Sequence, residues 1–123
     1  MNRSQLFWHI LNRYGVEPEY PWADSPDAAV FRHSSNRKWF ALVMQVQADR
    51  LGLPGSDSVD VLNLKCDPRL IGALLTQPGF RPAYHMNKNH WVTVLLGDQV
   101  PDEDLKSLLD MSYDLTAPQK RSK

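Results

Sequence analysis

Two groups of turn-forming residues, each next to segments of strand character, most constrain how this chain can fold. Residues 34–37 (SSNR) lie between a short apolar segment and the long segment 38–47, and residues 87–89 (NKN) precede the apolar segment 90–96. Turn residues between two β-type segments favour a hairpin, whose strands are antiparallel. Two hairpins in one chain therefore predict an α+β fold, in which helices pack on an antiparallel sheet.

The periodicity of apolar residues predicts the order α-β-β-β-α-β-β-α, with about five strands in the sheet. Ser4 is the expected N-cap of the first helix, Gly15 ends that helix, and Asp67 followed by Pro68 begins the second. The predicted helices are 5–14, 68–76 and 101–113, and the predicted strands are 29–33, 38–47, 59–65, 80–86 and 90–96.

The charge balance and the cysteine count exclude several classes of protein. Lysine plus arginine equals aspartate plus glutamate at 14 each, so the chain is not a strongly basic binder of polyanions. The single cysteine, Cys66, excludes an internal disulfide and a cysteine-cluster metal site. We find no apolar run of about 18 residues and no signal peptide, so we expect a cytoplasmic protein with no membrane partner.

The charges are nevertheless segregated along the sequence. Residues 28–48 and 68–97 contain no aspartate or glutamate. Both segments carry basic residues, among them Arg32, Arg37 and Lys38 in the first and Arg81 and Lys88 in the second. Arginine and lysine at hairpin turns can contact phosphates, and asparagine can contact base edges, so both hairpins are candidates for binding nucleic acid.

Residues 85–91 (HMNKNHW) combine two histidines, two asparagines, one lysine and one tryptophan. His85 and His90 flank the turn and are compatible with a two-histidine metal site, but no third ligand is near in sequence. The alternative is a polar hairpin turn that Trp91 anchors to the core. Strand alternation predicts that Trp91 is largely buried, and the position of Lys88 in the middle of the turn predicts that it is exposed. Because asparagine tolerates the positive φ that tight turns need, Asn87 and Asn89 are expected to shape the turn.

No enzyme signature accompanies this segment. The chain has no phosphate-binding glycine loop and no serine elbow, and no nucleophile can be paired with a base. The sequence therefore indicates no catalytic residue, no enzyme activity, no cofactor and no metal.

Residues 85–94 (HMNKNHWVTV) resemble the H-x-N-K-x-H-W block of the MmcQ/YjbR family of small bacterial proteins. Residues 62–68 (LNLKCDP) are similar to the strand-to-helix joint of that family, and residues 108–115 (LLDMSYDL) are similar to its last helix. The resemblance spans about residues 4–118, and the loop at 48–58 is longer and more polar than the family pattern.

This resemblance implies one domain over residues 1–118, with a fold often grouped with the secretion-chaperone-like folds. The basic segment 119–123 is then an expected disordered tail. The resemblance also implies a role in DNA binding, in which the hairpins 31–39 and 84–91 act as two wings. The DNA contacts expected from it are Arg32, Arg37, Lys38, Arg81, His85, Asn87, Lys88, Asn89 and His90.

Two other functions remain open from the sequence. One is a protein-interaction module without nucleic-acid activity, which forms a homodimer or binds a peptide at a strand edge or at the aromatic segment 20–22. The other is a small enzyme or metal-binding protein built on His85, Asn87, Lys88 and His90. Because the net charge is balanced, we expect any DNA binding to be weak.

Overall fold

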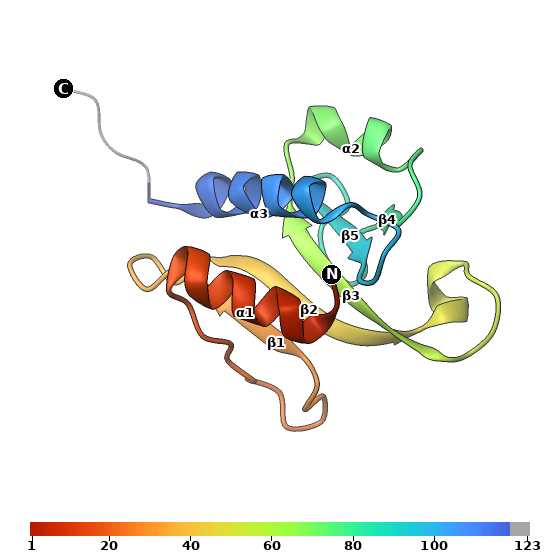
Figure 1. The fold of residues 1–123 in the computed structure, drawn as a ribbon, viewed down its shortest axis with the longest axis horizontal. Coiled ribbons are helices and arrows are strands. Elements are labelled where there is room, and N and C mark those ends of the chain that lie inside the picture. Colours follow the sequence, from red (N-terminus) through yellow and green to blue (C-terminus); the bar gives the residue numbers. More distant parts are fainter. Residues whose placement is uncertain (119–123) are drawn as a thin grey trace.

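The computed structural model describes residues 1–118, and the predicted basic tail 119–123 lies outside the described residues. The predicted order of helices and strands is confirmed (Figure 1). The elements are α1 (Arg3–Tyr14), β1 (Ala29–Arg32), β2 (Trp39–Gln47), the short 3₁₀ helix η1 (Ala48–Leu51), β3 (Ser58–Lys65), α2 (Pro68–Leu74), β4 (Phe80–Pro82), β5 (Trp91–Leu95) and α3 (Asp102–Thr116).

The five strands form one sheet in the order β1-β2-β3-β5-β4, and every neighbouring pair is antiparallel. The predicted α+β class is therefore confirmed. The two hairpin pairs, β1–β2 and β4–β5, occupy the two outer edges of the sheet, and β3 separates them.

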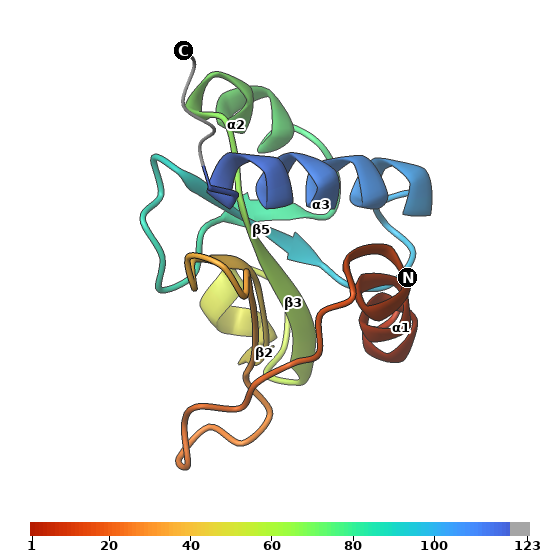
Figure 2. The ribbon, with the colours of Figure 1, turned by 90° about the vertical axis from the view of Figure 1, so that its left-hand side faces the viewer.

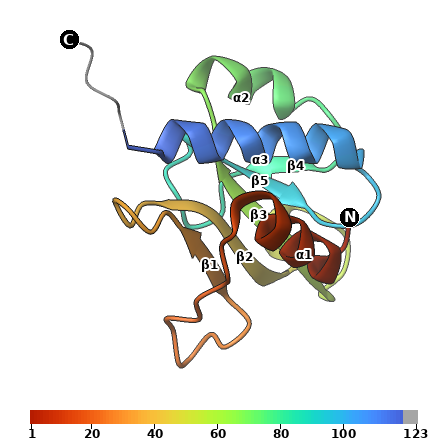
Figure 3. The ribbon, with the colours of Figure 1, turned by 60° about the vertical axis from the view of Figure 1, so that its left-hand side comes forward.

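One face of the sheet is covered by α1 and α3, which lie side by side across it (Figure 3). Leu6 and Ile10 point from α1 into the core, and Leu105 and Leu109 point from α3. All four are almost completely buried, which is what an amphipathic helix packed on a sheet requires. The strand residues of this core include Phe31, Phe40, Val43, Leu62, Leu64, Val92 and Val94.

The opposite face is covered by η1 and the loop that follows it. In Figure 2 the strands β2 and β3 stand between α1 and the yellow η1 turn. Leu51 of η1 packs against Val46, Val61 and Leu95 in a second apolar cluster. The long loop at 48–58 therefore buries the face of the sheet that the helices leave uncovered.

Most predicted boundaries move by one to three residues, and α3 extends to Thr116 rather than to residue 113. Two of the differences have a clear physical reason. The N-cap of α1 is Asn2 rather than Ser4, because Asn2 Oδ1 accepts from the Gln5 amide at 2.8 Å while Gln5 Oε1 accepts from the Asn2 amide at 2.9 Å. This reciprocal capping box satisfies two free amides at the start of the helix. The strand predicted at 80–86 ends at Pro82, since proline has no N–H with which to continue the pairing.

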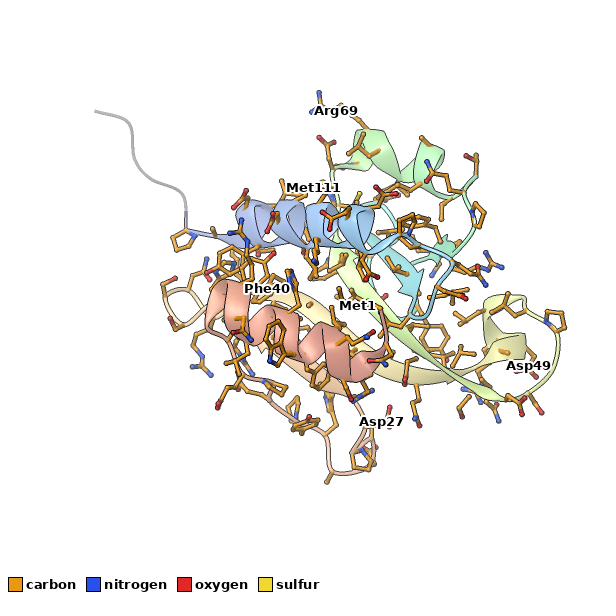
Figure 4. All side chains as sticks on the ribbon, viewed as in Figure 1. Met1, Asp27, Phe40, Asp49, Arg69 and Met111 are labelled. Carbon is orange, nitrogen blue, oxygen red and sulfur yellow. The ribbon has the colours of Figure 1, made fainter. Side chains whose placement is uncertain are left out.

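The end of α3 is fixed to the sheet by a buried serine. Ser112 Oγ donates to the Phe40 carbonyl oxygen at 2.6 Å and accepts from the Lys65 amide at 2.9 Å. Ser112 thereby joins β2 to the end of β3, close to the point where Phe40 lies between α1 and α3 (Figure 4). The register of β1 against β2 shifts beside this point, between Phe31 and Arg32, so Phe40 has no paired residue in β1.

The substitution Ser112→Ala is expected to lower the free energy of unfolding by about 1–3 kcal/mol, because it removes the partner of the buried Phe40 carbonyl and of the partly buried Lys65 amide. The midpoint of urea denaturation measures the change. Ser107→Ala is the matched control, because Ser107 lies on the exposed side of the same helix. Equal midpoints for the two variants would show that the Ser112 hydrogen bonds contribute nothing to stability.

Candidate nucleic-acid interface

Both predicted turns lie at the same end of the sheet, which we call the turn end. In an antiparallel sheet of this order the last residues of β1, β3 and β4 meet the first residues of β2 and β5. Figure 2 looks onto this end, with the turn 33–38 in orange and the connection 83–90 in teal. Three strand spacings separate the two turns, which corresponds to about 14 Å along the hydrogen-bonding direction.

The charge segregation of the sequence corresponds only in part to the two ends of this sheet, because Glu19 and Asp67 also lie at the turn end. The end opposite the turn end carries carboxylates on the connections between strands, namely Asp27 before β1, Asp49 and Asp57 between β2 and β3, and Asp98 after β5. In Figure 4 Asp49 lies on the far side of the molecule from the turn 33–38. At the turn end Glu19 and Asp67 are paired with Arg32 and Arg69, so these carboxylates do not neutralise the exposed cations of the two turns.

The turn 33–38 presents two exposed cations on a closed backbone. The Arg37 amide donates to the His33 carbonyl oxygen, and the His33 amide donates to the Lys38 carbonyl oxygen, both at 3.0 Å. Asn36 Oδ1 accepts from the Lys38 amide at 3.0 Å. These bonds fix the backbone, and the side chains of Arg37 and Lys38 remain exposed.

A buried histidine anchors this turn to the end of α3. His33 Nε2 lies 3.0 Å from the Tyr113 carbonyl oxygen and 2.9 Å from Thr116 Oγ1. The side-chain amide of Asn36 donates to the Thr116 carbonyl oxygen at 2.9 Å. The first wing therefore has a fixed position relative to the helical layer, which preorganises its cations.

The connection 83–90 is held by Asn87. Its Oδ1 accepts from the Asn89 amide at 2.9 Å, and its carbonyl oxygen accepts from the Trp91 amide at 2.9 Å. Trp91 is 9% exposed and Lys88 is exposed, as the strand alternation predicted.

The positive φ that tight turns need is not found at the asparagines. Among the described residues other than glycine, positive φ occurs at Arg37 (62°) and His85 (58°), and neither Asn87 nor Asn89 adopts it. Asn87 serves its turn through a side-chain acceptor instead, which is the alternative way in which asparagine stabilises turns.

Two of the predicted contact residues have their charged groups engaged within the protein. Arg32 Nε lies 2.8 Å from Glu19 Oε2, and its side chain is 20% exposed. Arg81 Nε donates to the Leu51 carbonyl oxygen at 3.1 Å, on the face of the sheet opposite the helices. Within residues 1–118, no ion pair involves the remaining cations Arg37, Lys38 and Lys88.

The sequence interpretation missed two cations at the turn end. Lys65 ends β3, and its Nζ lies 5.7 Å from the centroid of the Trp91 ring, within the range of a cation–π contact. Arg69 follows in α2, and its side chain hydrogen-bonds to Asp67, which lowers the pKa of that carboxyl to about 2. Only the antiparallel order of β3 between the two hairpins brings these residues to the same end as the wings.

Within residues 1–118 no group of three or more histidine, cysteine, aspartate or glutamate side chains could hold a metal ion. His85 and His90 are both exposed, and the third ligand that the sequence lacked is not supplied by the fold. In the same part of the chain, every helix is too short or too polar to cross a membrane.

We compared the chain with protein-family models, with curated proteins and with solved structures, and each comparison gave matches. The YjbR family model matches residues 11–115. The uncharacterized protein YyaQ of Bacillus subtilis (strain 168) is 39% identical over 116 residues, which cover 94% of this chain and 98% of YyaQ. A crystal structure of a protein from Pseudomonas syringae superimposes with a TM-score of 0.93 at 46% identity and covers 95% of this chain and 100% of that one. A Deinococcus radiodurans protein, DR2400, gives a TM-score of 0.64 at 31% identity, covering 88% of this chain and 72% of that one.

The left-handed backbone of Arg37 allows its charge to be removed in two ways that differ in stability. Both Arg37→Gly and Arg37→Val delete the cation, but a β-branched side chain is strongly disfavoured at φ 62°. Arg37→Val is therefore expected to be about 1–2 kcal/mol less stable than Arg37→Gly in urea denaturation.

Lys38 supplies the control, because its φ is not positive. At this position the glycine variant is expected to be the less stable of the two, since glycine loses more backbone entropy on folding. The opposite order at Arg37, with valine equal to or better than glycine, would contradict a strained backbone at that residue.

Proposed function

The chain belongs to the YjbR family, and we propose that it binds DNA through the turn end of its sheet. The observation that carries this proposal is the convergence of two hairpin turns on one end of the sheet, each with exposed cations. Arg37 and Lys38 in one turn and Lys88 in the other have no ion-pair partner among residues 1–118. Cations without a partner are the groups that phosphates of nucleic acid attract.

The spacing of the turns supports DNA as the ligand. Three strand spacings amount to about 14 Å, and the major groove of B-DNA is about 12 Å wide. Two turns held at this separation contact the phosphates on both sides of one groove. The anchoring of the first turn by His33 and Asn36 means that little conformational entropy is lost on binding.

The polar residues of the second turn have a different role from the cations. His85, Asn89 and His90 are exposed beside Lys88 and can hydrogen-bond to the DNA backbone or to base edges. Arg32 and Arg81 contribute to the positive potential, but their guanidinium groups are held by Glu19 and by backbone carbonyls. About three phosphate contacts are then expected, with a slope of log affinity against log salt of about −3.

The protein-interaction alternative has less support at the strand edges. β1 is flanked by an isolated bridge in which Glu19 and Val30 exchange backbone hydrogen bonds of 2.8 and 2.9 Å. β4 has three residues and ends in Pro82. Short or covered edges offer little room for an added peptide strand.

The substitution Lys88→Glu is expected to weaken DNA binding and to reduce the steepness of the salt slope by about one, because it removes one phosphate contact. The loss is expected to be uniform across duplex sequences, since phosphate contacts carry no sequence information. Fluorescence anisotropy of labelled duplexes at several salt concentrations measures both quantities, and circular dichroism checks that the variant is folded.

The substitution Arg37→Glu on the other wing is expected to have the same effect, and the two losses are expected to add because the sites are separated. Lys106→Glu is the charge-matched control, since Lys106 lies near the start of α3, away from the turn end. If both wing variants bind DNA as the parent does, the turn end is not a DNA interface. A stable dimer that does not bind DNA would then favour the interaction module.

A further inference from the structure

A cavity of about 360 Å³ lies on the face of the sheet opposite α1 and α3, between η1 and the segment that follows β4. It is separate from the exposed surface of the first wing. Its lining contains three cationic side chains and no carboxylate: Arg50, Leu51, Arg81, Pro82, Ala83, Tyr84, His85 and Lys88.

The guanidinium of Arg81 is fixed in this cavity by the backbone. Its Nε donates to the Leu51 carbonyl oxygen at 3.1 Å, and its Nη1 donates to the Phe80 carbonyl oxygen at 2.8 Å. The residue is half-buried and has no carboxylate partner within residues 1–118. A partly buried charge without a counter-charge is unfavourable, so the cavity is complementary to an anion.

A second arginine and an aromatic pair complete the lining. Arg50 Nη1 lies 3.5 Å from the Tyr84 hydroxyl oxygen, which joins η1 to the segment after β4. The Tyr84 ring meets the His85 ring edge to face, with 4.1 Å between the centroids. Guanidinium groups match the geometry of phosphate oxygens, and aromatic rings offer a surface for a planar group.

We propose that this cavity binds a small organic phosphate of about the size of a nucleoside monophosphate. Arg50, Arg81 and Lys88 hold the phosphate, and the rings of Tyr84 and His85 contact the planar part of the ligand. The volume suits a small molecule and is too small to admit a duplex. Lys88 and His85 belong to both proposed surfaces, so the two bindings are distinguished by Arg50, which lines the cavity alone, and by Arg37, which lies in the first turn alone.

The test is an NMR titration of ¹⁵N-labelled protein with inorganic phosphate, with adenosine monophosphate and with adenosine, at constant ionic strength. Both phosphates are expected to give saturable changes in the amide chemical shifts of residues 50–51 and 81–88. Adenosine monophosphate is expected to bind about tenfold more tightly than inorganic phosphate, because its base adds stacking. Adenosine without a phosphate is expected to give no saturable shift.

Arg50→Gln is expected to weaken binding of both phosphates about tenfold, and Lys106→Gln, at the start of α3, is the control that should not. Arg81→Lys is the second variant. It keeps the charge but removes the guanidinium fork, and it is also expected to weaken phosphate binding. Unchanged affinity in both cavity variants, or equal shifts with potassium chloride, would overturn the site. Equal affinity for inorganic phosphate and adenosine monophosphate would overturn the organic ligand.

Two variants distinguish the proposed phosphate binding from the proposed DNA binding. Arg50→Gln is expected to leave DNA affinity unchanged, and Arg37→Glu is expected to leave phosphate affinity unchanged. Loss of phosphate binding in Arg37→Glu would mean that the cavity has no separate specificity, and the inference would be wrong.

Discussion

The turn end of the sheet depends on the hydrogen bonds made by the last turn of α3. Ser112 connects β2 to β3, and Thr116 receives His33 and Asn36 from the first wing. All of these groups are wholly or partly buried, and buried polar groups need their partners. The helix can therefore occupy one position only along the sheet, and this position orders the wing that projects beyond it. Packing of apolar side chains alone tolerates small shifts, but a buried network does not.

The fold class was predictable from the sequence because its signals are local. Turn residues between β-type segments specify hairpins, and hairpins specify antiparallel neighbours. The burial of Trp91 and the exposure of Lys88 followed from the alternation of a strand and the polarity of a turn. Counting carboxylates along the chain predicted that both turns lack acidic residues, and the fold brings these two turns to one end of the sheet.

The features that were not predictable depend on partners distant in sequence or on choices between similar residues. Asn2 and Ser4 are both good N-caps, and the presence of Gln5 three residues after Asn2 decides between them. The pairing of Arg32 with Glu19 requires the segment before β1 to fold back along it. The meeting of Arg50 with Arg81 requires η1 to cover the second face of the sheet, and no periodicity in the sequence encodes that contact.

Because the two hairpins lie on opposite edges of the sheet, the sheet fixes the distance between their turns. The width between the turns is set by β2, β3 and β5 and their twist, and not by the lengths of the loops at the other end. Insertions in the loop at 48–58 leave this width unchanged, whereas a change in the twist of the central strands alters it. A partner that contacts both turns at once must therefore match this distance, whatever chemical groups it presents to the side chains.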